Sequence, residues 1–296
     1  MMLILISDSF NKSLPEKLKK FGEVTDDKNR LSEAEIVLIR SKTKATKEYI
    51  DSAPNLKLIL RGGVGLDNVD IQYAVSKGIQ VKNTAEASTT AVAELAFSMM
   101  MGLANQVNFA DNSMREGKWL KKEINRVELY GKTLGILGMG RIGTSLAIRA
   151  RAFQMRVLAW HPDVHFSDFA EIRPTLDEVL KESDFMSVHI PLLDETAGMI
   201  NKEKLSLCKK GAFIINTGRA KVVNENDVAE SLKSGHLGGY ATDVWQKDPP
   251  DGSPLFEAPN CLFSPHVGAS TQENMTRIGI VMEMLIDSYI KEKNKG

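Results

Sequence analysis

Short runs of hydrophobic residues recur along the chain at intervals that leave room for a helix between them. A first series lies at 3–7, 36–40, 56–60 and 79–83, and a second at 133–138, 156–160, 185–190, 212–216 and 261–265. Several of the amphipathic segments between them open with Ser, Asp or Asn and close with Gly, as helices do. Continuous Val, Ile and Leu strands that alternate with such helices are typical of parallel sheets covered on both faces. The pattern predicts the α/β fold class.

The same pattern predicts two domains. A helical region at 88–117 separates the two series of strands, and only the second series carries a glycine-rich turn after its first strand. We therefore expect a Rossmann-type nucleotide domain at 103–268, inserted into a flavodoxin-like substrate domain made of residues 1–102 and 269–296. The apolar stretch 91–104 is interrupted by Glu94 and is shorter than a membrane span.

Composition narrows the class of function through charge and cysteine use. Lys plus Arg equals Asp plus Glu at 38 each, so no bulk charge favours nucleic acid or an anionic membrane as a partner. Cys208 and Cys261 fit neither a disulfide framework nor a metal site, and the five histidines show no metal-ligand spacing. The chain opens with a strand pattern where a secreted protein would have a signal peptide. We expect a soluble, cytoplasmic protein without a metal.

The glycine-rich turn is the strongest local signal. Gly138, Gly140 and Gly143 form G-x-G-x-x-G between a strand and a helix, the context that a dinucleotide-binding turn requires. The first glycine permits the tight turn, the second lets a pyrophosphate approach the backbone, and the third lets helix and strand pack closely. Arg141 and Ile142 stand in the same turn, where the helix N-terminus offers N–H groups to a phosphate. The turn predicts a bound dinucleotide.

The strand that follows this turn lacks the acid that usually binds the ribose. His161 occupies its place in VLAWHPD, and Asp163 follows two residues later. An acid there would repel a 2′-phosphate, and His161 removes that repulsion without supplying an arginine. Either His161 covers the adenine edge while Asp163 or a backbone group binds the ribose, or a protonated His161 weakly accepts a phosphate. We expect NAD as the preferred cofactor and NADP as the alternative.

Polar residues that follow buried strands form a candidate catalytic set. Arg219 follows the run AFIIN, Asp248 lies in the proline-rich turn after GYATD, and His266 lies in SPHVGAST. Any one of them alone would more often form an ion pair or cap a helix. Ligands of open α/β sheets bind at such strand ends, however, and an arginine, an acid and a histidine together suit acid–base chemistry on a carboxylate substrate.

Seven motifs in order along the chain match one known family. They are RGGVGLDNVD, REGKW, GKTLGILGMGRIG, HIPLL, INTGRA, ATDVW and SPHVGAST. With them the chain resembles the D-isomer-specific 2-hydroxyacid dehydrogenases, and within that family the phosphoglycerate dehydrogenases. The resemblance implies that Arg219 binds the substrate carboxylate, that His266 is the acid–base, and that Asp248 orients His266. The family usually has glutamate where this chain has Asp248, so the shorter side chain needs a closer turn or a bridging water.

The resemblance also implies which residues line the ligand sites. The further cofactor residues would be His189, Pro191, Thr217, Asp243 and Gly268, with Asp243 at the nicotinamide amide; the alternative for Asp243 is a strand-end cap. The substrate residues would be Arg40, Ser41, Lys42, Gly62, Gly63, Val64 and Asn83. The basic loop 40–42 suits a phosphate, and the backbone N–H groups of RGGVG suit a carboxylate.

Three functions follow from these observations. The first is NAD-dependent oxidation of D-3-phosphoglycerate to 3-phosphohydroxypyruvate, a step of serine biosynthesis, which the basic loop favours. The second is reduction of glyoxylate or hydroxypyruvate, which the absence of an acid at His161 favours slightly. The third is a nucleotide-sensing binding protein that keeps the site residues. The family further suggests a homodimer through the nucleotide domain, and the position of Gly296 suggests a short form without the C-terminal regulatory domain, hence no feedback inhibition by serine.

Overall fold

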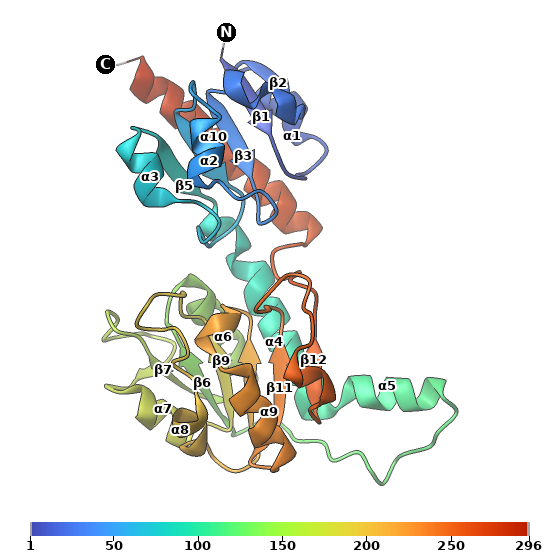
Figure 1. Cartoon of the computed structure of the whole chain (residues 1–296). Coiled ribbons are helices and arrows are strands. Elements are labelled where there is room, and N and C mark those ends of the chain that lie inside the picture. Colours follow the sequence, from blue (N-terminus) through green and yellow to red (C-terminus); the bar gives the residue numbers. More distant parts are fainter. Residues whose placement is uncertain (1, 295–296) are drawn as a thin grey trace. The chain divides into compact units, whose positions relative to one another are not determined.

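The computed structural model describes residues 2–294, which divide into two compact units (Figure 1). The first unit contains residues up to 88 and from 269 onward, and the second contains Thr89–Gly268, so the second is inserted into the first along the chain. Residues 89–102, assigned to the first domain from the sequence, belong to the second unit. The reason is that helix α4 (Thr89–Asn105) buries Ala93, Ala96 and Met100 in the core of the second sheet.

The first unit is a parallel sheet with the strand order β2-β1-β3-β4-β5, the order of flavodoxin-like folds. Its strands are β1 (Leu3–Ile6), β2 (Glu23–Thr25), β3 (Ile36–Ile39), β4 (Leu58–Arg61) and β5 (Gln80–Asn83). Its helices are α1 (Leu14–Leu18), α2 (Lys47–Asp51), α3 (Ile71–Ser76) and α10 (Gln272–Lys293), with 3-10 turns η1 (Lys28–Glu33) and η2 (Ala85–Ser88). Helices α1 and α10 cover one face of the sheet, and α2 and α3 cover the other.

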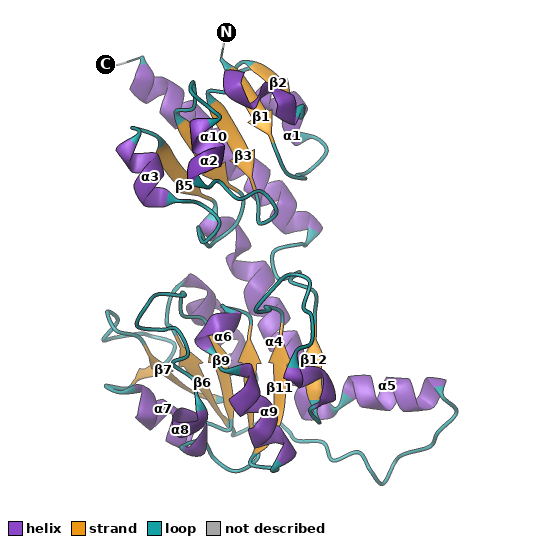
Figure 2. Ribbon diagram, in the orientation of Figure 1, coloured by secondary structure: helices purple, strands orange, loops and turns teal. Residues whose placement is uncertain are grey.

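The second unit is a parallel sheet in the order β12-β11-β10-β9-β6-β7-β8, with helices on both faces (Figure 2). Its strands are β6 (Thr133–Leu137), β7 (Arg156–Trp160), β8 (Glu171–Ile172), β9 (Phe185–Val188), β10 (Ala212–Asn216), β11 (Leu237–Thr242) and β12 (Cys261–Phe263). Besides α4, its helices are α5 (Val107–Arg115), α6 (Arg141–Ala152), α7 (Leu176–Glu182), α8 (Lys202–Ser206) and α9 (Glu225–Lys233), with 3-10 turns η3 (Ala220–Val222) and η4 (Pro254–Glu257). The strand order is that of a Rossmann-type domain, which confirms the expected fold class.

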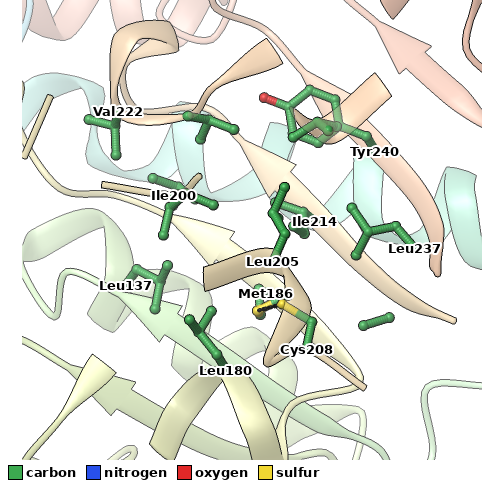
Figure 3. Close-up of a cluster of buried hydrophobic side chains, with 14 of the residues drawn as sticks. Leu137, Leu180, Met186, Ile200, Leu205, Cys208, Ile214, Val222, Leu237 and Tyr240 are labelled. Carbon is green, nitrogen blue, oxygen red and sulfur yellow. Dashed lines mark hydrogen bonds between the residues drawn. The ribbon is translucent and has the colours of Figure 1, made fainter. Parts of the chain in front are cut away.

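The core of the second unit explains how its strands are held. Figure 3 shows the buried cluster to which Leu137, Met186 and Ile214 contribute from three neighbouring strands. Cys208 is part of this cluster, and burial raises the pKa of its thiol to about 12. The thiol therefore stays protonated at neutral pH and packs as a small hydrophobic side chain.

Helix α4 is the central apolar helix of the second unit. Together with the preceding turn it forms the 21-residue stretch Ala85–Asn105, which length and composition alone would allow to cross a membrane. In the fold 56% of the most apolar 18 consecutive residues of this stretch is buried inside the protein. The stretch is longer than the apolar segment expected from the sequence, and its side chains from Ala93 to Ala104 contribute to the core that α4 shares with β6 and α6.

Candidate active site

The carboxyl ends of the parallel strands gather the sequence-predicted cofactor and catalytic residues of the second unit at one edge of its sheet. The sheet order places β6 between β9 and β7. After β6 the chain adds β7 and β8 on one side of β6, and it then adds β9 to β12 on the other side. Open α/β sheets bind ligands at the carboxyl edge of such a switch point. The loops that follow β6, β7, β9, β10, β11 and β12 are those with the predicted residues.

The glycine-rich turn connects β6 to α6 as the sequence predicts. Gly138 has a φ of +103°, and a Cβ placed on it would lie 2.7 Å from the backbone of His189. A Cβ on Gly143 would lie 2.3 Å from the carbonyl oxygen of Gly138. A Cβ on Gly140, by contrast, would meet nothing within 4 Å. The first glycine is therefore required by its positive φ and by its close approach to the loop after β9, and the third by packing within the turn. The second leaves the backbone open to an incoming phosphate.

The start of helix α6 is suited to an anion. The helix begins at Arg141, no side chain caps its first N–H groups, and its first turn contains no acidic residue. Such N–H groups are satisfied by water or by a ligand, and the helix dipole favours negative charge there. Arg141 adds a positive charge in the same turn. This arrangement fits the pyrophosphate of a dinucleotide.

Two buried polar atoms at the neighbouring strand ends also fit a bound cofactor. Within residues 2–294, Nδ1 of His189 after β9 and Oγ1 of Thr217 after β10 have no hydrogen-bond partner. A buried polar atom without a partner costs free energy, so a ligand that bonds to it is favoured. The other ring nitrogen of His189 lies 2.8 Å from Oγ of Ser187, and burial lowers the pKa of His189 to about 4. His189 is therefore neutral and serves as a hydrogen-bonding group.

His161 follows β7 and is half-buried. Its Nδ1 accepts a hydrogen bond of 3.0 Å from the backbone N–H of Asp163. A neutral imidazole that accepts at Nδ1 has its proton on Nε2, so His161 presents a donor to a ligand. The carboxylate of Asp163 is exposed. Pro191, the other predicted cofactor residue on this side, lies exposed after β9.

The structure brings His266 and Asp248 together. Nδ1 of His266 lies 2.5 Å from Oδ2 of Asp248, and both side chains are partly exposed. An ionised carboxylate can only accept, so the imidazole donates through Nδ1–H. Nε2 is then left unprotonated in the neutral ring, where it can accept a proton from a substrate. The shorter acid reaches the imidazole directly, and no bridging water is needed.

Asp243 shapes the turn that contains His266. Its buried carboxylate accepts hydrogen bonds from the hydroxyl of Ser264 at 2.5 Å and from the backbone N–H groups of Val267 and Gly268, both at 2.8 Å. The residues that donate these bonds stand before and after His266 in the chain, so the bonds fix the turn on both sides of it. The φ of His266 is +53°, in the left-handed region. The alternative of a strand-end cap is thus realised, and the proposed nicotinamide contact stays a prediction. A Cβ on Gly268 would lie 2.9 Å from Oδ2 of Asp243, so the turn needs glycine there.

Arg219 lies in a turn ordered by the buried side chain of Asn216. The amide oxygen of Asn216 accepts from the N–H of Gly218 at 3.1 Å, and its amide nitrogen donates to the carbonyl of Arg219 at 3.1 Å. The guanidinium of Arg219 is half-buried and donates to the carbonyl of Gly218 at 2.9 Å. Its charge is therefore positioned at the carboxyl end of β10, where a carboxylate ligand would be paired.

In the first unit, the basic loop is held from both sides. The carboxylate of Asp8 accepts from the backbone N–H of Arg40 at 2.6 Å and from the N–H and hydroxyl of Thr43 at 3.1 and 2.8 Å. The amide of Asn68 donates to the carbonyls of Arg40 and Thr43 at 2.7 and 2.6 Å. Burial lowers the pKa of Arg40, although an arginine stays charged at neutral pH. Ser41 and Lys42 at the tip are exposed.

The RGGVG loop is partly occupied by contacts within the protein. The N–H groups of Gly62 and Gly63 donate to the carbonyl of Ile39 at 2.8 Å and to the hydroxyl of Thr84 at 2.9 Å. An anion held by this loop would therefore be bound from Val64 onward, and not from Gly62 as the sequence suggests. The amide of Asn83 donates to the carbonyl of Val64 at 2.5 Å, so Asn83 orders the loop.

Sequence reasoning did not find several residues that order these loops. They are Asp8, Asn68, Thr84, Asn216, Glu225 and Ser264, which hydrogen-bond within the loops that contain Arg40, Gly63, Arg219, Asp248 and His266. Asp243 follows β11 directly and Asp8 lies two residues after β1, so an acid within two residues of the end of a buried strand is the signal that could have identified Asp8.

Comparisons with known proteins agree with this geometry. Residues 97–268 match the family described as D-isomer specific 2-hydroxyacid dehydrogenase, NAD binding domain. The chain is 40% identical to hydroxypyruvate reductase of Thermotoga maritima over 265 residues, which cover 88% of this chain and 86% of that protein. It is 35% identical to D-3-phosphoglycerate dehydrogenase of Methanocaldococcus jannaschii over 303 residues, 98% of this chain and 58% of that protein. The chain thus spans less than two thirds of the latter relative.

A solved structure shows the same arrangement of elements. The chain superimposes on D-lactate dehydrogenase from Aquifex aeolicus, complexed with NAD and lactic acid, with a TM-score of 0.87. The two are 28% identical, and the match covers 99% of this chain and 96% of that one.

Proposed function

The chain belongs to the D-isomer specific 2-hydroxyacid dehydrogenase family, and on this premise we propose that it oxidises D-3-phosphoglycerate to 3-phosphohydroxypyruvate with NAD. NAD, when bound, supplies the acceptor for the hydride that leaves the substrate carbon. Unprotonated Nε2 of His266 takes the hydroxyl proton, Asp248 holds the imidazole in the required tautomer, and Arg219 pairs with the substrate carboxylate. In the reverse direction the protonated imidazole returns that proton to the carbonyl oxygen.

The observation that carries the choice of substrate is Arg40. Its Nε is buried and has no hydrogen-bond partner within residues 2–294, while the loop backbone around it is held by Asp8 and Asn68. A guanidinium in a fixed loop is suited to a phosphate, which supplies several acceptor oxygens. Lys42 adds a second positive charge at the exposed tip of this loop. Serine biosynthesis is the process in which this reaction would take place.

A second candidate is reduction of hydroxypyruvate or glyoxylate. It is favoured by the relative from Thermotoga maritima, which this chain matches over most of its length. The chain also has His161 where an acid would repel NADP, so a reductase that uses NADPH fits this position.

Steady-state kinetics separates these functions. We expect kcat/KM for 3-phosphoglycerate to exceed that for D-glycerate by ~10–100-fold, the value of a hydrogen bond to a charged group. Equal values would remove the argument for a phosphate site at Arg40. Faster turnover of hydroxypyruvate or glyoxylate than of 3-phosphohydroxypyruvate would establish the second function. No turnover of any of these acids would leave a nucleotide-sensing binding protein.

We also propose that the protein acts as a homodimer through its nucleotide unit. In support, α5 and the segment after it expose large apolar side chains, namely Val107, Phe109, Met114, Trp119 and Tyr130. Exposed aromatic and methionine side chains are enriched at interfaces between subunits. Light scattering on the purified protein should give twice the mass of one chain, and Met114→Glu with Trp119→Glu should give a monomer. A monomeric wild-type protein would contradict the proposal.

A further inference from the structure

We propose that Glu225 is a positioning residue for His266 and Asp248, because its buried carboxylate holds the loop 246–253 from which Asp248 projects. The inference rests on the proposed function, in which His266 is the acid–base. Glu225 touches neither member of the pair, and it would act only through the loop.

The loop itself is not held by a hydrophobic core. Residues 246–249, 251 and 252 are exposed, and a pocket of about 580 Å³ lies against the loop. The pocket is lined on one side by Gln246, Lys247, Asp251 and Ser253 of the loop and on the other by residues that include Lys221 and Glu225. Because side chains do not fill the space behind it, the loop can change position unless its ends are fixed.

The two ends of the loop are fixed by different contacts. At its start, Nε1 of Trp245 donates to the carbonyl of Ser264 at 3.0 Å, and its ring packs against Phe256 and Phe263. This contact links the loop to the turn that contains His266. At its far end, the hydroxyl of Ser253 donates to Oε2 of Glu225 at 3.0 Å.

Glu225 holds the far end of the loop and borders its start. It is the first residue of α9, the residue is 9% exposed, and its carboxylate accepts from the hydroxyl of Ser253. It also lines the same pocket as Gln246, at the start of the loop. Burial raises the pKa of Glu225, and hydrogen bonding to Ser253 and to the backbone of Gln246 opposes that shift. A buried carboxylate bonded to the loop restricts its motion, since moving Ser253 away would leave a buried charge without that partner.

The consequence for the site is geometric. Asp248 lies two positions after Gln246 and five before Ser253, and its Oδ2 must stay close to Nδ1 of His266. A displacement of about 1 Å is enough to lose such a bond and can reduce the rate ~100-fold. If Glu225 had only a structural role, as the acid in the first turn of α9, its replacement would lower the stability of the fold and leave the tautomer of His266 unchanged.

The tautomer of His266 provides a test that does not depend on turnover. In the full-length protein at about pH 8.5, where an ordinary histidine is neutral, long-range ¹H–¹⁵N NMR distinguishes Nδ1–H from Nε2–H. We expect Nδ1–H for wild type, and a loss of this form in Glu225→Gln that matches Asp248→Asn. The matched control is Glu230→Gln, an exposed acid on the same helix that pairs with Lys202. An unchanged tautomer in a folded Glu225→Gln protein would overturn the inference.

Kinetics then tests whether Glu225 acts through Asp248. Glu225→Gln should lower kcat by ~10–100-fold with little change in KM, and the double variant with Asp248→Asn should be no slower than Asp248→Asn alone. Losses that multiply would mean that Glu225 acts by another route. If Glu225→Gln does not fold, Ser253→Ala removes the hydrogen bond between the loop and Glu225 and should shift the tautomer in the same direction; an unchanged tautomer there would count against the inference.

The two experiments keep the inference separate from the function on which it rests. If the wild-type protein turns over none of the hydroxy acids, the proposed function fails, while the tautomer of His266 still decides whether Glu225 holds the loop.

Discussion

Nδ1 of His266 lies 2.5 Å from Oδ2 of Asp248, although eighteen positions separate the two residues in the chain. The pair sits on two loops at the carboxyl edge of the second sheet, one after β11 and one after β12. The contact decides which nitrogen of His266 is available to a substrate, because the carboxylate can only accept. It also shows that an aspartate side chain is long enough to reach the imidazole directly.

Removing either member of this pair should slow the reaction at saturating substrate. His266→Asn should lower kcat by ~10²–10⁴-fold, the usual contribution of an acid–base group. Asp248→Asn should lower kcat by a smaller factor, since the imidazole remains but its tautomer is no longer held. Asp251→Asn in the same exposed loop is the control and should resemble wild type. Wild-type kcat in Asp248→Asn would mean that the hydrogen bond has no part in catalysis.

Arg40 should matter only for a phosphorylated substrate. Arg40→Gln removes the charge and should raise KM for 3-phosphoglycerate by ~10–100-fold, the effect of losing a hydrogen bond to a charged group. KM for D-glycerate should change little. Lys44→Gln, an exposed lysine just after the loop, should leave both values near those of wild type. Equal losses for the two substrates would instead indicate that Arg40 supports the loop.

His161 should govern the choice between NAD and NADP. His161→Asp places a carboxylate at the end of β7, where it would bond the ribose hydroxyls and repel a 2′-phosphate. We expect the ratio of kcat/KM with NAD to that with NADP to rise by ~10-fold, or ~1.4 kcal/mol. Asp163→Asn serves as the comparison. If only the second variant changes the ratio, Asp163 binds the ribose and His161 does not.

His189 should make the folded state sensitive to mild acid. Burial lowers the pKa of His189 from 6.5 to about 4, so between these values the unfolded chain binds a proton that the folded chain does not. The fold with a neutral, buried His189 is therefore fully stable above pH 6.5. As the pH falls towards 4, the free energy of unfolding drops by roughly 3 kcal/mol, because the unfolded chain takes up a proton at this residue.

Urea unfolding from about pH 7.5 to 4.5 would measure this effect. The stability of His189→Gln should depend less steeply on pH than that of wild type, and His236→Gln is the matched control. Parallel curves for wild type and His189→Gln would contradict the prediction.

Much of the fold can be predicted from short segments of the sequence. Strands such as β3 and β6 are buried on both faces, so their continuous hydrophobic runs are visible without knowledge of their neighbours. The glycine turn is equally local, because the conformation of Gly138 and the contact between Gly143 and Gly138 arise within six residues. For the same reason the order Arg219, Asp248, His266 could be recognised from its place after successive strands.

The hydrophobic pattern did not predict two of the strands, because they are stabilised by pairing with a neighbouring strand and not by residues of their own segment. Strand β2 has three half-buried residues, Glu-Val-Thr, and becomes a strand only by pairing with β1. Strand β8 is a two-residue pairing with β7 at the edge of the sheet. Neither segment has a hydrophobic run, so its pairing depends on what the sheet offers at its edge.

The sequence alone was sufficient for the fold class and the dinucleotide turn, since each depends on residue types at short spacing. It proposed the candidate catalytic residues from their places after strands and from the family motifs. The way in which the loops are held emerged only on folding. Asp243 is 25 positions from Gly268, and Glu225 is 28 from Ser253. An acid that will accept buried hydrogen bonds looks the same in a sequence as one that will face solvent. The difference arises because strand order brings distant loops together, and no local pattern of polar and apolar residues encodes which loops will meet.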